Sequence, residues 1–325
     1  MAEKQNKRKS ALSIDFLPLI VAYIVLIAFF AIKSPHFFTV KNFLNIALYA
    51  ANVGILACTM TLVIVAGHID LSIGSVIALA GVVMGKIMQA GLPVIVAVLA
   101  CLAVGMLTGV YNAILITRVH INAFITTLAG MEIFRGCAYL VTNGKAITLS
   151  GEFIKQIGRG YTLGIPNAVI IMLIMIVIFA WISKFTTFGR RIYVIGGGSQ
   201  VAYLSGINVE RNLSLLFILN GLMCGLATMI YCSQLGSAMP SNASGMEFDV
   251  ISAVILGGAS LSGGKGSIVG ALFGALFGAL LLGTLNNGMV MLNIHTYWQQ
   301  VISGIVLVVA VVFDVVKKRR EQRSV

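Results

Sequence analysis

The sequence predicts an all-α membrane protein, a polytopic bundle of about ten transmembrane helices with both termini in the cytoplasm. Three observations lead to this fold class: the 325 residues are 59% hydrophobic, only 10% are charged, and apolar runs of about 20 residues recur along the chain. Soluble domains are roughly 45–50% apolar and about 25% charged, so these few charges could not cover a water-facing surface. The composition therefore excludes a soluble domain, a disordered chain and a secreted disulfide scaffold.

The expected membrane spans are separated by short interruptions. They are residues 16–33, 46–66, 73–90, 93–116, 122–141, 167–185, 213–234, 248–262, 267–289 and 297–315. A bilayer crossing needs roughly 20 apolar residues, which these runs approach. The run 248–262 is short and interrupted by glycine, so we expect a broken or re-entrant helix there.

The basic residues indicate the orientation. With both termini inside, fifteen Lys and Arg residues lie in cytoplasmic segments, six lie outside, and Arg135 lies within a span. This excess follows the positive-inside rule. The formal charge is +12, and nine of the 22 Lys and Arg residues lie in the two tails that flank the apolar spans. There is no basic surface interleaved with aromatic residues, so nucleic acid is excluded as a partner.

The chain reads as a single transmembrane domain over 1–325, with cytoplasmic tails at 1–15 and 316–325. The inner loop 186–212 is the largest cytoplasmic segment after the tails. Its Gly196–Gly198 run breaks the chain, and Ser199 is placed to cap a short helix. That helix carries the apolar residues Val201, Ala202, Leu204 and Ile207, so we expect an amphipathic docking element, with a plain connector as the alternative.

No enzyme signature is present. The histidines lack metal-binding spacing, no G-x-S-x-G elbow has a triad, and the five cysteines form no C-x-x-C pair. The glycine-rich run 257–266 departs from a P-loop at Ala259 and at Gly266. We therefore predict no catalytic residue, no metal and no cofactor, and any ATP must be bound by a separate subunit.

Several polar residues lie within or beside the apolar spans. Asp70 lies at a helix break beside Ser72, where a carboxylate can cap free N–H groups; contact with a substrate is the alternative. Glu132 and Arg135 share one helical face, which predicts an ion pair, with a proton relay as the alternative.

A second polar group lies in the last two spans. Asn286, Asn287 and Gln299 are suited to hydrogen bonding with a hydroxyl-rich solute. Interfacial anchoring by the neighbouring Tyr297 and Trp298 explains the same pattern equally well. We treat Asp70, Ser72 and these three amides as candidate pathway or gating residues.

Two glycine patterns concern helix packing. Gly270, Gly274 and Gly278 form a small-xxx-small ridge that brings helix backbones together, within one bundle or between subunits.

The stretches 63–75 and 254–267 resemble each other, since each contains an apolar run, a glycine break, a polar turn and another apolar run. This echo is typical of the duplicated halves of transporters.

The order and spacing of several motifs resemble one known family. These motifs are Met60–Ile64, Gly67–Ser75, Arg135–Gly136, Thr142–Gly144, Gly189–Tyr193, Leu204–Asn208, the run 257–267, Leu285–Gly288 and Ala310–Asp314. Together they cover nearly the whole chain and resemble the permease subunits of sugar ABC importers of the ribose, xylose and galactose type. The sequence departs from the family pattern at His68, Glu132 and Ser199.

The resemblance implies a permease in the bacterial cytoplasmic (inner) membrane that moves a pentose or hexose. It implies three partners: an ABC ATPase, an extracytoplasmic sugar-binding protein and a second permease subunit, in a homodimer or heterodimer. It identifies 187–212 as the coupling loop, with contacts to the ATPase expected from Gly198, Ser199, Val201, Ala202, Leu204, Ser205, Gly206 and Ile207. The outer-loop cations Lys145, Lys155 and Arg159 are candidates for contact with the binding protein.

Three alternatives remain open from the sequence. A branched-chain amino-acid ABC permease has a related fold. A proton-coupled secondary carrier needs coupling charges within the spans, for which Glu132 and Arg135 are the candidates. A membrane enzyme has no supporting residue constellation.

Overall fold

The computed structural model describes residues 20–261, 263–264 and 268–323, most of which are helical. The first described helix covers Ile20–Lys33. The others are α2 Val40–Val65, α3 Ile73–Gln89, α4 Val94–Thr117, α5 Ala123–Thr142, α6 Glu152–Arg159, α7 Asn167–Phe185, α8 Thr187–Gly197, α9 Ser199–Leu204, α10 Val209–Leu235, α11 Met246–Leu256, α12 Ile268–Met291 and α13 Thr296–Arg323.

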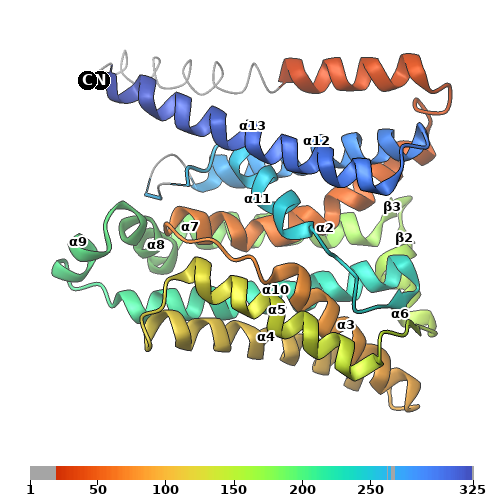
Figure 1. Ribbon diagram of the computed structural model, residues 1–325, viewed down its shortest axis with the longest axis horizontal. Coiled ribbons are helices and arrows are strands. Elements are labelled where there is room, and N and C mark those ends of the chain that lie inside the picture. Colours follow the sequence, from red (N-terminus) through yellow and green to blue (C-terminus); the bar gives the residue numbers. More distant parts are fainter. Residues whose placement is uncertain (1–19, 262, 265–267, 324–325) are drawn as a thin grey trace.

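The long helices lie side by side and give the molecule two distinct ends (Figure 1). The α9 end holds α8, α9 and the C-terminal part of α13. The α6 end holds α6 and four two-residue strands. In one antiparallel pair β1 (Ile147–Thr148) meets β4 (Ser237–Ala238), and in the other β2 (Tyr161–Thr162) meets β3 (Ile165–Pro166). This division places the predicted inner loop 186–212 and the predicted outer-loop cations Lys145, Lys155 and Arg159 at opposite ends.

Most of the predicted membrane spans are confirmed as helices. Six of the described helices are long and apolar enough to cross a membrane: α2, α4, α5, α7, α10 and Gly270–Met291 of α12. Three shorter apolar helices cover Ile20–Lys33, Ile73–Gln89 and Thr296–Val312. The protein is therefore an all-α membrane protein.

The expectation that the helix at 248–262 is broken is confirmed, since this segment is not a full helical crossing. The helix α11 has 11 residues, about 17 Å at 1.5 Å per residue, against a hydrocarbon core of about 30 Å. It ends at Gly257, and the next residue, Gly258, has a φ of +92° that few other residues adopt. Since β4 lies at the α6 end and Gly264 contacts α8 at the other end, the segment still runs between both ends, half of it as irregular chain.

The terminal segments also differ from expectation. Residues 316–323 of the predicted cytoplasmic tail continue α13 as helix. The other predicted tail, 1–15, lies outside the described residues. The basic end of the chain is thus a helical extension of the last span.

The helix α2 forms the centre of the bundle, since every residue from Ala50 to Val65 is buried. Elsewhere in the bundle, glycines allow two backbones to approach closely where helices cross, because a larger side chain would clash there. A Cβ on Gly105 of α4 would lie 2.3 Å from the carbonyl oxygen of Gly221 in α10. A Cβ on Gly274 of α12 would lie 2.0 Å from the carbonyl oxygen of Gly257. The glycine ridge of α12 therefore packs within one bundle, as one of the two sequence readings held.

Candidate functional site

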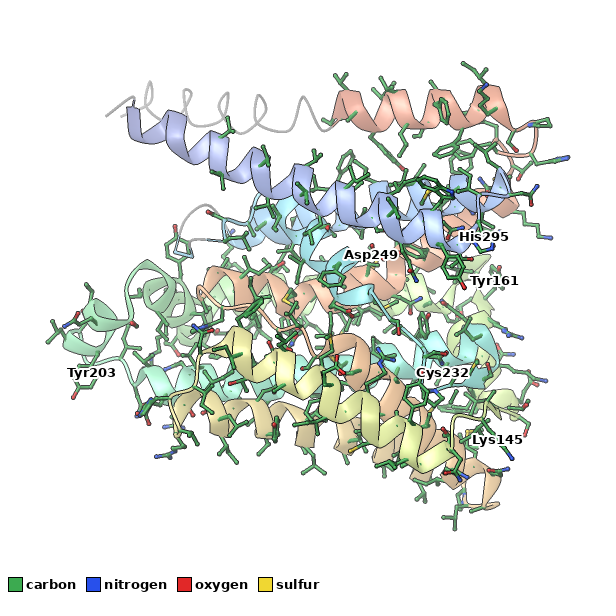
Figure 2. All side chains as sticks on the ribbon, in the orientation of Figure 1. Lys145, Tyr161, Tyr203, Cys232, Asp249 and His295 are labelled. Atoms are coloured by element: carbon green, nitrogen blue, oxygen red, sulfur yellow. The ribbon has the colours of Figure 1, made fainter. Side chains whose placement is uncertain are left out.

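The α8–α9 segment projects from the bundle at the α9 end, where Tyr203 lies at the tip (Figure 2). The helix α8 is capped by Thr186, whose Oγ1 accepts a hydrogen bond from the backbone N–H of Gly189 at 3.3 Å. The chain leaves α9 through Gly206, whose φ of +78° favours glycine. The prediction that Ser199 caps α9 is wrong, because Gly198 occupies the cap position and Ser199 is the first helical residue.

The short helix α9 exposes apolar side chains to solvent. Ala202 is fully buried, whereas Val201 is 63% exposed, Tyr203 73% and Leu204 80%. The expected set of apolar residues is thus divided, with Ala202 facing inward and Val201 and Leu204 facing outward. The sequence reasoning missed Tyr203, although an aromatic residue between two apolar ones on a short polar loop is a recognisable signal. An exposed apolar cluster of this kind marks an interaction surface.

A groove of about 960 Å³ lies between α9 and the neighbouring ends of α4 and α10. Its lining includes Ser199, Leu204, Gly206 and Ile207 of the predicted coupling residues. The exposed pair Arg118 and Glu210, 3.9 Å apart, lies at the same helix ends. Four of the eight predicted docking residues therefore line one groove at this end of the molecule.

A glycine junction connects the α8–α9 segment to the rest of the bundle. It consists of Gly196 in α8, Val65 at the end of α2, and Gly263 and Gly264 after α11. The N–H of Gly264 donates to the carbonyl oxygen of Val65 at 2.9 Å. A Cβ on Gly196 would lie 1.7 Å from that carbonyl oxygen. The two chain breaks that resemble each other in sequence thus meet at α8, backbone against backbone.

The predicted pathway residues Asp70 and Ser72 lie in a buried polar network. One oxygen of Asp70, Oδ1, accepts from the N–H of Ser72 at 2.9 Å and from its hydroxyl at 2.6 Å. The other, Oδ2, accepts from Nδ2 of Asn220 at 2.8 Å. Asn112 donates to the Ser72 hydroxyl at 3.0 Å, and Thr59 donates to Asn220 at 2.7 Å.

This network ties together three helices, α2, α4 and α10, and the loop before α3. Asp70 is only 3% exposed and Ser72 1%, so neither contacts a solute in this conformation, and the capping interpretation of Asp70 fits the geometry. Burial raises the pKa of the Asp70 carboxyl above its usual value, and the hydrogen bonds that it accepts oppose that shift. Sequence reasoning missed Asn112 and Asn220, whose signal was an amide inside an otherwise apolar helix.

The three predicted amides are not one cluster. Asn286 donates from Nδ2 to the hydroxyl of Tyr49 at 2.9 Å, and Tyr49 donates to Asp249 at 2.6 Å. Gln299 instead donates to the carbonyl oxygen of Ile294 at 3.0 Å. The side-chain oxygen of Asn287 is buried without a partner among the described residues. Asp249 lies between the two ends in Figure 2, so this polar chain lies within the length of the bundle, away from both ends.

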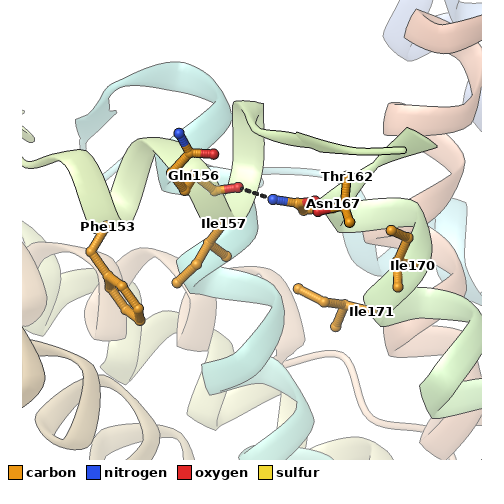
Figure 3. Close-up of a pocket in the computed structure, with 7 residues that line it drawn as sticks. All are labelled: Phe153, Gln156, Ile157, Thr162, Asn167, Ile170 and Ile171. Carbon is orange, nitrogen blue, oxygen red and sulfur yellow. Dashed lines mark hydrogen bonds between the residues drawn. The ribbon is translucent and has the colours of Figure 1, made fainter. Parts of the chain in front are cut away.

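The predicted outer cations differ in their contacts. Lys145 and Lys155 are exposed, whereas Arg159 also donates from Nε to the carbonyl oxygen of Gln234 at 2.9 Å. Nearby, a groove of about 380 Å³ lies between α6 and α7. Figure 3 shows Asn167 donating to the carbonyl oxygen of Gln156 across its polar edge, at 2.7 Å. The role of these cations in contact with a partner stays a prediction.

The expected ion pair between Glu132 and Arg135 is wrong. The Arg135 guanidinium donates from Nη1 to the carbonyl oxygens of Pro240 and Asn242, at 2.6 and 2.7 Å. Glu132 is exposed at the middle of α5 and forms no ion pair with the described part of the chain. The reason is tertiary: the chain between α10 and α11 offers Arg135 two carbonyls that helix spacing could not reveal. A charge at the centre of a span costs about 2.5–3.5 kcal/mol or more on insertion scales. The exposure of the Glu132 carboxylate in the middle of α5 therefore requires an explanation.

Comparison with known proteins gives consistent matches over most of the chain. The model of a family described as branched-chain amino acid transport system / permease component matches residues 42–311. The ribose import permease protein RbsC of Escherichia coli (strain K12) is 39% identical over 299 residues, covering 91% of this chain and 92% of that protein. The RbsC protein of Bacillus subtilis (strain 168) is 41% identical over 292 residues, covering 89% of each chain. The L-arabinose ABC transporter permease protein AraH of Azospirillum brasilense is 35% identical over 305 residues, covering 94% and 88%. No solved structure gives a significant match.

Proposed function

The chain belongs to the family of branched-chain amino acid transport system permease components, and on that premise we propose that it is the permease subunit of an ATP-driven ABC importer for a simple sugar. The proposed solute is a pentose or a hexose, and the proposed location is the bacterial cytoplasmic membrane. The relatives named above support a sugar, because they are named for ribose or arabinose. The family description, which names amino acids, makes a branched-chain amino acid the second candidate.

The proposed topology has ten passes with both termini in the cytoplasm. The six long helices and the three shorter apolar helices account for nine of them. The tenth is the segment that leads from β4 through α11 to Gly264, half helix and half irregular chain. Irregular backbone at membrane depth is tolerated where protein surrounds it, and Glu247 and Asn242 in this segment are 4% and 6% exposed.

The single observation that carries the proposed mechanism is the α8–α9 segment. Its exposed apolar tip suits an ATPase subunit, and its base touches both chain breaks at the glycine junction. When the ATPases bind ATP and close, they push this segment and tilt the permease halves, which changes the side to which the pathway opens. The binding protein delivers the sugar at the α6 end, near Lys145 and Lys155.

Transport in a defined system tests this proposal. The chain is reconstituted in proteoliposomes with its ATPase and its sugar-binding protein, and uptake of labelled ribose, arabinose and leucine is measured. We expect ATP-dependent uptake of one sugar, which requires both partners. Uptake of leucine alone would favour the second candidate.

The secondary-carrier alternative makes a different prediction. It requires uptake by the chain alone, driven by a proton gradient. The engagement of Arg135 with two backbone carbonyls disfavours it, since the presumed charge pair for proton coupling does not form. Gradient-driven uptake without an ATPase would overturn the proposed function.

A further inference from the structure

The open face of α5 differs from the other exposed helix faces of the bundle. Glu132 lies at the middle of this 20-residue helix and is exposed. It makes no hydrogen bond or ion pair with any described residue. A carboxylate on a short side chain cannot reach the membrane surface from the middle of a span, as the long Lys and Arg side chains do near helix ends.

The exposed face of α7 provides the comparison within the same molecule. Its outward side chains are Ile174, Val177 and Trp181, which are 49%, 67% and 58% exposed. They are the apolar residues expected against lipid. Charged residues within membrane spans, by contrast, almost always face the bundle interior or a water-filled cavity. The neighbouring Leu128 and Ile133 are also exposed, at 40% and 47%, so it is the Glu132 carboxylate that indicates contact with water rather than lipid at this face of α5.

Two further residues lie on the same face of α5 as Glu132. Gly136 and Tyr139 follow it by four and seven residues, which places all three in one stripe. None of the described atoms lies within 4 Å of the position that a Cβ on Gly136 would occupy. Tyr139 is 47% exposed. The stripe thus offers an acceptor, an open space and an aromatic ring in sequence along the helix.

This combination of groups suits a sugar. A carboxylate accepts strong hydrogen bonds from hydroxyl groups, and an aromatic ring packs against the C–H face of a pyranose or furanose ring. Gly136 leaves room for that ring between the two side chains.

The orientation of α5 is fixed by its packing against α3 and α4 and by Arg135. Its guanidinium holds the carbonyl oxygens of Pro240 and Asn242, which ties one side of α5 to the chain before α11. The charges of Glu132 and Arg135 still attract each other, but the two side chains form no ion pair, and the stripe lies on the exposed side of α5. Arg135 is a positioning residue for the stripe.

From these observations we infer that Glu132, Gly136 and Tyr139 form a sugar-contacting stripe in an aqueous pathway, with Glu132 accepting hydrogen bonds from the sugar hydroxyls. The inference rests on the proposed function and names the residues that the solute meets inside the membrane. The opposite wall of the pathway is supplied by the proposed second permease subunit.

Accessibility to a charged thiol reagent tests the aqueous setting without any transport. Glu132→Cys is made in a Cys137→Ser background and assembled with the ATPase in membranes, with Val177→Cys on α7 as the matched control. We expect a membrane-impermeant sulfonate reagent to label Glu132→Cys at least about tenfold faster than the control, since thiolates form only in contact with water. Equal, slow labelling of both positions would overturn the inference.

Uptake by the full importer tests contact with the sugar. We expect Glu132→Leu to lower initial sugar uptake about tenfold or more, because a hydrogen bond to a charged group is lost. Glu132→Gln keeps a carbonyl acceptor and retains more uptake. ATP hydrolysis stimulated by the binding protein stays near that of the unmodified importer in both variants, which shows that docking and coupling are intact.

The two possible failures are distinguishable. If the unmodified importer takes up no sugar, the proposed function fails. If it takes up sugar and Glu132→Leu does so at the same rate across all sugar concentrations, the inference fails while the proposed function stands.

Discussion

The glycine junction allows a sharp test, because Gly196 and Gly197 are neighbours with opposite surroundings. A Cβ on Gly196 would lie 1.7 Å from the carbonyl oxygen of Val65 and 2.7 Å from the N–H nitrogen of Gly264. A Cβ on Gly197 would have nothing within 4 Å among the described atoms. Gly196→Ala therefore perturbs the contact between α8 and the two chain breaks, and Gly197→Ala is its matched control.

The size of the effect follows from the distances. Side-chain carbons essentially never approach closer than 3.0 Å, so α8 and α2 must separate by at least 1.3 Å, the difference between 3.0 Å and 1.7 Å. Such overpacking costs about 1–3 kcal/mol. Separation also strains the 2.9 Å hydrogen bond from Gly264 to Val65, which contributes about 1 kcal/mol. The total, roughly 2–4 kcal/mol, exceeds the gain in helix propensity of at most about 1 kcal/mol.

Two measurements on reconstituted importer check this expectation. The thermal unfolding midpoint of Gly196→Ala falls below that of the unmodified protein, and its sugar uptake per ATP hydrolysed drops at least about tenfold, since 1.4 kcal/mol is a factor of ten. Gly197→Ala keeps the unmodified values or unfolds slightly later. If Gly196→Ala unfolds and transports like Gly197→Ala, the reasoning about a rigid backbone contact is refuted.

Three further substitutions follow from the same structure. The Leu204 side chain is 80% exposed, so Leu204→Asp leaves the unfolding midpoint unchanged. It weakens co-purification of the ATPase about tenfold or more, as expected of an interface anchor. The control is Leu163→Asp at the α6 end, where Leu163 is 97% exposed, and this variant leaves co-purification intact. Asp70→Ala strands buried donors and lowers stability by about 2–5 kcal/mol, measured by unfolding in detergent, whereas an effect below about 0.5 kcal/mol would contradict the buried network. Gly105→Ala places a Cβ 2.3 Å from a carbonyl oxygen of α10 and lowers the same midpoint, while Gly304→Ala on α13, with nothing within 4 Å, does not.

Apolar periodicity predicted the long helices well because lipid imposes a simple rule on them. The run 167–185 coincides with α7, and 93–116 and 122–141 each differ from α4 and α5 by one residue at either end. The run 248–262 was expected to be broken because of its glycines, although hydropathy alone does not register the left-handed backbone of Gly258. A glycine in an apolar run fits both a tight helix crossing and a chain break, and only the packing decides between them.

Polar contacts were predictable only where they are local. Asp70 and Ser72 are two residues apart, and their turn follows from sequence alone. The bond from Arg135 to Asn242 spans 107 residues, so the helix spacing that suggested Glu132 as its partner gave the wrong answer. The same applies to Asn220 and Asp70, which are 150 residues apart. Sequence patterns identify the polar residues, but the tertiary fold determines which residues they contact.

The contacts of the polar groups connect the surface proposed to bind the ATPase with the face of α5 proposed to contact the sugar. Interior amides and carboxylates are mostly used to hold helices together, and the exposed charge of Glu132 on α5 is an exception that a packed interior does not explain. The helix α11 lies between the glycine junction at its C-terminal side and the chain that Arg135 holds at its N-terminal side. Eleven residues of helix, about 17 Å long, thus connect the surface that suits an ATPase to the face of α5 that suits a sugar. The glycine junction holds one side of α11 by a backbone contact and the Arg135 side chain holds the chain on the other side, so a shift of α8 has a route through α11 to α5.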